Sequence, residues 1–112
     1  METFREVKIE VYIPEPYIER LRDALHQAHA GKVGNYDHCL SVTNVRGYWR
    51  PLEGSSPFEG RIGEIAEGAE CKVEVRCERR YVSDALQAIR QVHPYEEPLI
   101  NVIPLANHLF ES

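Results

Sequence analysis

The sequence contains an internal repeat, and this repeat constrains the fold more than any other feature. Residues 8–29 align without gaps to residues 72–93, and seven of the 22 aligned positions are identical. The identical pairs are Lys8/Lys72, Glu10/Glu74, Val11/Val75, Tyr17/Tyr81, Ala24/Ala88, Gln27/Gln91 and His29/His93. Chance similarity between two amphipathic segments is the alternative explanation. If the repeat is real, the chain holds two copies of one structural unit.

Each copy begins with the pattern of a strand and continues with the pattern of a helix. Apolar residues first alternate with polar ones, which is typical of a strand with one buried face. They then recur at helical spacing, which gives each helix one apolar side. The strand positions are Val7, Ile9, Val11 and Ile13 in the first copy, and Cys71, Val73, Val75 and Cys77 in the second. The helix positions are Ile18, Leu21, Leu25 and Ala28, then Val82, Ala85 or Leu86, Ile89 and Val92.

A further extended stretch follows each predicted helix, at residues 36–45 and 99–105. The resulting order βαββαβ is typical of the α+β class. It predicts a ferredoxin-like sandwich, a four-stranded antiparallel sheet with two helices on one face. An open α/β sheet is the alternative, but two helices are too few to cover both faces of such a sheet.

The 112 residues suit one domain, because domains usually hold about 100–200 residues. We therefore expect residues 1–112 to form a single domain. Its repeat halves lie at about 6–48 and 70–105, and a glycine-rich loop at 49–68 joins them. Lys, Glu and Arg side chains occupy the sheet face away from the helices, which faces either solvent or other subunits.

The net charge of -5 argues against nucleic-acid binding, because phosphate backbones attract basic surfaces. No apolar run approaches the roughly 20 residues needed to span a bilayer, and the first residues lack the apolar stretch of a signal peptide. We expect a cytoplasmic protein without a membrane partner. Three cysteines make a disulfide framework improbable, so they read as reduced thiols.

The loop at 49–68 has an unusual composition for a connection inside a compact domain. Five of the seven glycines lie between Gly47 and Gly68. Loops longer than roughly 12–15 residues are usually functional or disordered, and the aromatic residues here favour order. Two interpretations remain open: a structural loop that covers the sheet edge or a neighbour, and a ligand-facing loop. In the second, Arg50 follows an aromatic pair able to stack on a flat ring.

Residues 93–98, with the sequence HPYEEP, end the second predicted helix. His93 next to the helix dipole and Pro94 after it explain termination without any further role. The alternative is an acid/base pair or a metal site formed by His93 with Glu96 or Glu97. His29 from another subunit would strengthen such a metal site.

The other histidines, His26, His38 and His108, are isolated in sequence and read as surface or satisfied core groups. The chain has no G-x-S-x-G, C-x-x-C or H-E-x-x-H pattern.

Four ordered motifs resemble the central inserted domain of the Nif-three-like (YqfO-type) family over about residues 5–105. They are GKVGNY at 31–36, GYWRPLEG at 47–54 with PFEG at 57–60, EVRCE at 74–78 and HPYEEP at 93–98. The last motif also resembles CutA, a trimeric protein linked to divalent cation tolerance. The resemblance implies a PII/CutA-like fold and a homotrimer with ligands in clefts between subunits. Long members of the family carry metal-binding halves that 112 residues cannot include, so we expect no hydrolase activity.

Three hypotheses follow. The first is a non-enzymatic oligomeric module that binds a small molecule or a partner protein at subunit clefts; its candidate residues are Tyr36, Arg50, Glu53, His93, Tyr95 and Glu96. The second is a CutA-like protein that binds a divalent metal through His93, Glu96 and Glu97. The third is a small enzyme, for which the sequence offers no catalytic residue. No cofactor other than a divalent metal is expected.

Overall fold

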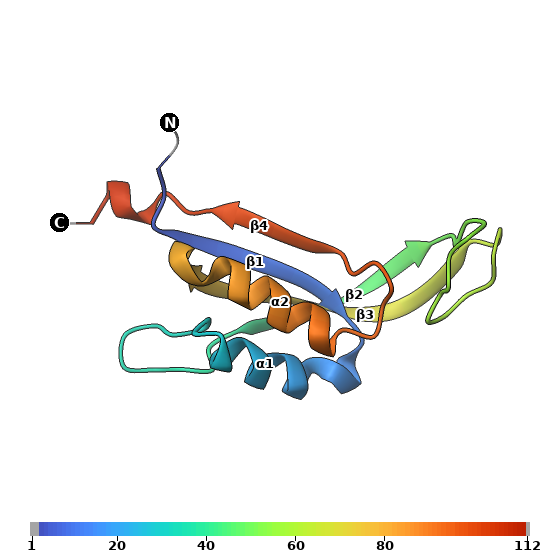
Figure 1. Ribbon diagram of the computed structural model, residues 1–112, viewed down its shortest axis with the longest axis horizontal. Helices are drawn as coiled ribbons and strands as arrows, with labels where there is room; N and C mark the ends of the chain where they lie inside the picture. Colours follow the sequence, from blue (N-terminus) through green and yellow to red (C-terminus); the bar gives the residue numbers. More distant parts are fainter. Residues whose placement is uncertain (1–2, 112) are drawn as a thin grey trace.

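The computed structural model of the protein describes residues 3–111. It contains one four-stranded antiparallel sheet with two helices on one face (Figure 1). The strands are β1 (Glu6–Ile13), β2 (Ser41–Trp49), β3 (Ala66–Glu78) and β4 (Ile100–Pro104), and the helices are α1 (Ile18–Gln27) and α2 (Val82–Val92). The strand order is β2-β3-β1-β4. The predicted ferredoxin-like fold is therefore confirmed.

The repeat is visible in the register of the two central strands. Glu10 and Glu74, which the sequence repeat aligns, lie directly opposite each other in the β1–β3 ladder. Repeat mates face each other directly only where a two-fold axis passes between them, so a pseudo-two-fold axis crosses the sheet there. The axis makes α1 and α2 antiparallel (Figure 1). His29 and His93, which follow the two helices, consequently lie at opposite ends of the helical layer, as the repeat predicts.

The core lies between the sheet and the two helices. Alternate residues of β1 and β3 are buried, as the strand pattern predicts. In α2, the helical spacing predicts that either Ala85 or Leu86 faces the core. Ala85 is fully buried, whereas Leu86 is only partly buried. The largest fully buried side chains are Ile9, Ile13, Leu21, Leu25, Ile89, Val7, Val11 and Val73. Burial of apolar surface thus joins both repeat copies into one core.

The opposite face of the sheet carries charges that pair within the chain. The register places like charges directly opposite each other, Lys8 facing Arg76 and Glu10 facing Glu74. The ion pairs therefore form diagonally: Lys8 Nζ lies 2.6 Å from Glu74 Oε2, and Arg76 Nη2 lies 2.6 Å from Glu6 Oε1. These charges need no partner molecule to neutralise them.

Two predicted boundaries are wrong. The second strand begins at Ser41 rather than at residue 36, because residues 31–36 form a separate turn. In this turn Gly31 and Gly34 adopt φ values of 82° and 58°. The connection between the halves is also shorter than 49–68, because β2 and β3 stay paired as far as Trp49 and Ala66. The loop comprises residues 50–65. Neither helix in the described part of the chain has the length and apolar character to cross a bilayer.

Replacing Ile9 with Ala tests whether the central strand carries the core. Ile9 is fully buried, so the truncation should lower the free energy of unfolding by about 2–5 kcal/mol. Ile65→Ala is the matched control, because Ile65 is 76% exposed and its truncation should change stability by less than about 0.5 kcal/mol. Urea unfolding followed by far-UV circular dichroism measures both. Equal losses for the two variants would contradict this description of the core.

Candidate functional site

β2 and β3 extend beyond the body of the molecule as a two-stranded arm (Figure 1). β3 has 13 residues and β1 has 8, and their pairing ends where Ile13 faces Cys71. Residues 66–70 therefore pair with β2 alone. A cavity of about 760 Å³ lies where this arm meets the turn at residues 93–98. This cavity is the candidate site.

The indole of Trp49 organises the end of the arm. Its Nε1–H donates a hydrogen bond to the Glu59 carbonyl oxygen at 3.1 Å, which ties the loop back over the ring. Its ring lies against Gly68, where an added Cβ would come within 3.2 Å of the indole. Gly60, with a φ of 98°, turns the loop beside the same ring. The glycines of this region thus leave room for one large aromatic side chain.

The turn at 93–98 is held against the arm and its loop by three contacts. The Tyr95 hydroxyl donates a hydrogen bond to Glu70 of β3 at 3.0 Å. The backbone N–H of Ser56 donates to the Glu96 carboxylate at 2.8 Å. The ring of Phe58 lies between those of Tyr95 and Tyr17, at centroid distances of 5.8 and 6.3 Å. Three distant segments therefore form one wall of the cavity.

His93 supports this turn from inside the protein. Its side chain is buried, its Nε2 lies 2.7 Å from the Tyr12 carbonyl oxygen, and its Nδ1 accepts the N–H of Tyr95 at 3.2 Å. This pattern fixes a neutral imidazole protonated on Nε2. Burial lowers the pKa of His93 below its usual value, although the hydrogen bond to Tyr12 opposes the shift.

Burial also raises the pKa of Tyr95 well above its usual value, and the neighbouring Glu70 carboxylate adds to this shift. The phenol therefore stays protonated and remains a hydrogen-bond donor at neutral pH.

The structure brings some of the predicted residues together and separates others. Arg50, Tyr95, Glu96 and Glu97 line the cavity. His93 lies behind Tyr95 and does not line it, and Glu53 lies outside the lining on the loop. Tyr36 belongs to the segment between α1 and β2. The loop of this segment lies at the end of the molecule opposite to the arm (Figure 1).

The predicted metal set of His93, Glu96 and Glu97 is not assembled as a ligand cluster. Both ring nitrogens of His93 are engaged by backbone groups, so neither offers a free lone pair to an ion. The Glu96 carboxylate accepts the N–H of Ser56 instead. Within residues 3–111 these three residues do not gather their ligand atoms. These contacts support the role of the motif in ending α2 and forming a turn.

Several lining residues were missed in the sequence because no motif marks them. Glu70 sits on the polar side of a strand pattern, and Phe58 lies in a loop without periodicity. Each is positioned by a residue that is distant in sequence. Tyr95 donates a hydrogen bond to Glu70, and the rings of Tyr17 and Tyr95 pack against Phe58. Only the concentration of aromatic residues in the loop hinted at this wall.

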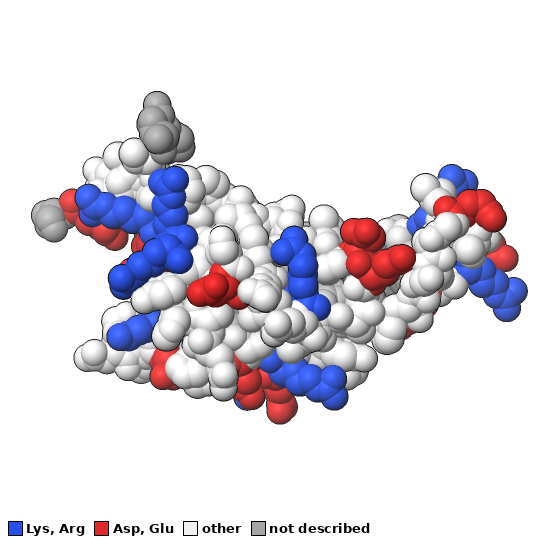
Figure 2. Space-filling model, in the orientation of Figure 1, with Lys and Arg blue, Asp and Glu red and all other residues white. Residues whose placement is uncertain are grey.

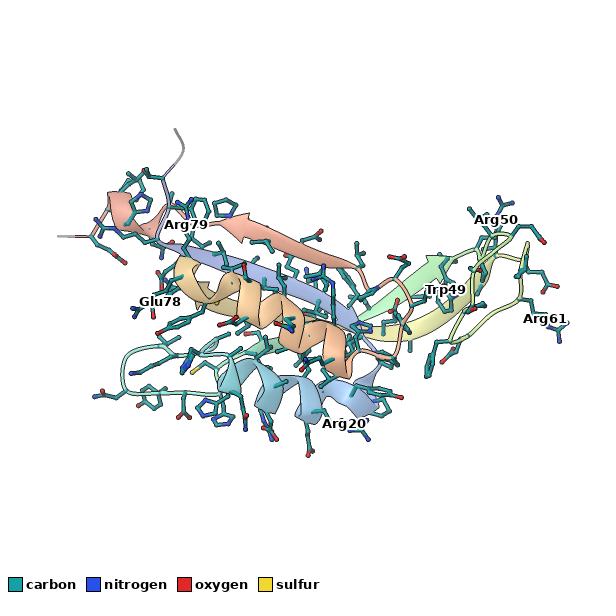
Figure 3. The ribbon with its side chains drawn as sticks, viewed as in Figure 1. Arg20, Trp49, Arg50, Arg61, Glu78 and Arg79 are labelled. Carbon is teal, nitrogen blue, oxygen red and sulfur yellow. The ribbon has the colours of Figure 1, made fainter. Side chains whose placement is uncertain are left out.

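The lining combines an apolar surface with an excess of carboxylates. Aromatic and aliphatic side chains supply most of it, namely Tyr12, Val45, Tyr48, Trp49, Pro51, Leu52, Pro57, Phe58, Tyr95 and Leu99. The charged members are Arg46, Arg50, Glu59, Glu70, Glu96 and Glu97. Figure 2 shows acidic side chains gathered where the arm leaves the body, and Figure 3 shows Trp49 on the arm, with Arg50 further out. Such a lining suits a flat apolar body that carries hydrogen-bond donors or positive charge.

His93→Gln tests the neutral role of the buried imidazole. The unfolded chain binds a proton near the usual histidine pKa of about 6.5, whereas the folded chain binds it only at lower pH. Folding stability should therefore be fully present above about pH 6.5 and fall as the pH drops through 6.5 toward the lower folded pKa.

The glutamine keeps an N–H donor but does not titrate, so the variant should lose less free energy of unfolding between pH 7 and 5.5 than the parent. Denaturant unfolding at several pH values measures this difference. Parallel losses in the two proteins would contradict a neutral buried His93.

No protein-family model matches the chain. It is 35% identical over 100 residues to a GTP cyclohydrolase 1 type 2 homolog from Halalkalibacterium halodurans, an alignment that covers 89% of this chain and 27% of that protein. A homolog of the same name from Bacillus subtilis is 35% identical over 98 residues, covering 88% and 26%. The chain thus spans about a quarter of the length of the curated relatives that it matches.

Two solved structures are also similar to this chain. A Bacillus cereus protein related to NIF3 superposes with a TM-score of 0.81 at 30% identity, covering 96% of this chain and 27% of that one. The divalent ion tolerance protein CutA1 from Ehrlichia chaffeensis superposes with a TM-score of 0.68 at 18% identity, covering 95% and 86%. The second likeness concerns the fold alone. The chain therefore corresponds to one domain of the Nif3-related proteins, and it has the fold of CutA.

Proposed function

We propose that this domain is a non-enzymatic binding module that takes a small aromatic molecule into the cavity between its arm and the 93–98 turn. A neighbouring subunit of a homotrimer closes the open side of this cavity. The observation that carries the proposal is the cavity itself, since about 760 Å³ lies within the usual range of small-molecule sites. Its walls come from segments far apart in sequence that specific contacts hold together.

The charges of the lining favour one class of ligand over another. Four carboxylates face two guanidinium groups there, so the cavity has a negative balance. Polyphosphates would meet repulsion, whereas a neutral or cationic ring would find acceptors in Glu59, Glu70, Glu96 and Glu97. We therefore propose nucleosides and aromatic amines as the ligand class, in preference to nucleotides.

Binding accounts for this cavity better than catalysis does. Neither histidine nor cysteine is among the lining residues described, and these two side chains are the most usual general base and thiol nucleophile. The Tyr95 hydroxyl donates to Glu70 with a pKa raised well above its usual value, so it serves as a fixed hydrogen-bond donor.

Metal binding through His93, Glu96 and Glu97 is the weaker alternative. The imidazole would have to break both of its backbone hydrogen bonds before it could coordinate an ion.

Exposed apolar side chains support an oligomer. On the arm and its loop, Tyr48 is 61% exposed and Leu52 is 59% exposed. The arm extends away from the core, so these side chains have little of the chain to pack against (Figure 1). Apolar surface of this kind is typical of protein interfaces. A trimer agrees with the resemblance to the CutA and PII trimers.

The single tryptophan provides a direct test of ligand binding, because Trp49 lines the cavity. Addition of adenosine should shift or quench the Trp49 emission. An aromatic amine that does not itself fluoresce in the range of tryptophan should have the same effect. ATP should bind at least about tenfold more weakly than adenosine, because its phosphates meet the carboxylates. A ligand at about 100 times its Kd should raise the free energy of unfolding by about 2.7 kcal/mol.

Two phenylalanine variants form the control pair. Phe58→Ala removes one wall of the cavity and should weaken adenosine binding. Phe110→Ala removes an exposed ring outside the lining and should leave it unchanged. If no nucleoside, nucleotide or aromatic amine alters the emission at millimolar concentration, or if both variants behave alike, the proposed ligand site is wrong.

The oligomer is tested separately by light scattering coupled to size-exclusion chromatography. We expect a mass three times the 12.9 kDa of one chain at tens of micromolar. A monomer at that concentration would remove the shared cleft, although the cavity within each chain would remain open to the fluorescence test.

A further inference from the structure

A second group of chemically active side chains lies away from the cavity, where α1 ends and the following loop returns. His26 comes from the last turn of α1, and Asp37 and His38 come from the loop between α1 and β2. One ligand atom from each of the three lies within 4.8 Å of the others. The rings of His26 and His38 are stacked, with centroids 3.9 Å apart and planes inclined by 21°.

The backbone of the loop places His38 against the helix. Gly31, with a φ of 82°, donates its N–H to the Arg76 carbonyl oxygen and accepts the N–H of Cys39 at 2.8 Å. These bonds close the loop at its base. His38 itself adopts a φ of 57°, a left-handed conformation that is uncommon outside glycine and that asparagine, aspartate and histidine adopt most readily. With this backbone conformation, the imidazole of His38 lies on the face of His26.

The local charges favour a cation between these groups. Asp37 Oδ1 lies 2.8 Å from His38 Nδ1, and Asp23 Oδ1 lies 3.9 Å from His38 Nε2. The arrangement therefore places imidazole nitrogens beside carboxylate oxygens.

We propose that His26, Asp37 and His38 bind a divalent transition-metal ion of the zinc type, with water in the fourth position. Two imidazoles and one carboxylate are the donor set of several zinc sites that keep one position open. Imidazole donors also suit Cu²⁺ and Ni²⁺, whereas Mg²⁺ and Ca²⁺ prefer oxygen ligands alone. Ligand atoms around tetrahedral zinc lie about 3.3 Å apart, and Asp37 and His38 are exposed side chains able to rotate into that geometry.

This site is independent of the cavity and of the predicted set at His93. It lies at the end of the molecule where α1 finishes, whereas the arm leaves the opposite end (Figure 1). The spacing also explains why no sequence motif marks this site, since His26 and His38 are separated by a turn of irregular backbone rather than by a helical or zinc-finger interval. Two glycines, Gly31 and Gly34, make this return possible.

The test is a calorimetric titration of the untagged, EDTA-treated chain with ZnCl₂. We expect one Zn²⁺ per chain, with binding weakened about tenfold or more in His26→Gln and in His38→Asn. Asparagine tolerates the left-handed conformation, so His38→Asn should keep the loop in place. His29→Asn is the matched control. His29 is also a histidine with a left-handed backbone, at a φ of 69°, but it lies outside the cluster. It should bind Zn²⁺ as the parent does.

Cobalt gives a second readout that does not depend on affinity. Co²⁺ in a tetrahedral site with nitrogen donors gives visible absorption bands, which should appear with the parent and with His29→Asn but not with His38→Asn. The proposal is overturned if the parent takes up no Zn²⁺ at 100 μM, if His38→Asn binds as tightly as the parent, or if His29→Asn loses binding equally. Circular dichroism of each variant checks that the fold is retained.

Discussion

The antiparallel pairing of β1 with β3 determines the rest of this structure. The two strands carry matching alternation, so a single register buries one face of both and exposes the charges of both. A slip of one residue would turn the apolar side chains of one strand away from the helices. Because Glu10 faces Glu74 at the centre of the ladder, each copy also brings its helix to the same side of the sheet.

The unequal lengths of these strands create the candidate site. Beyond Ile13, β3 has no partner on its β1 side, and the arm continues as a two-stranded ribbon. An isolated two-stranded ribbon is marginally stable in water. Here it is stabilised by Trp49, over which the loop folds, and by the bond from Tyr95 to Glu70. The contacts that keep the arm ordered are therefore the contacts that build the cavity.

Sequence reasoning predicted the fold well because the relevant patterns are periodic and local. The alternation from Val7 to Ile13 and its copy define both central strands, and the fold follows from their order. Of the candidate site residues, Arg50, Tyr95, Glu96 and Glu97 line one cavity, whereas Tyr36, Glu53 and His93 do not. These successes depend on information that adjacent residues carry.

The remaining features depend on long-range contacts, which no local pattern encodes. His93 has the same place in the repeat as His29, yet it is buried and bonded to Tyr12, whereas His29 is exposed beside Tyr81. The stacking of His26 on His38 likewise depends on the left-handed backbone of His38, which no sequence pattern predicts.

Gly47 and Gly68 face each other across the ladder halfway along the arm. This cross-strand pair has no side chains of its own, so neighbouring groups occupy the space beside it. Those groups are Trp49, whose ring lies against Gly68, and Glu70, whose carboxylate lies against Gly47. Both also line the cavity. A side chain added at either glycine would therefore displace a group that shapes the cavity.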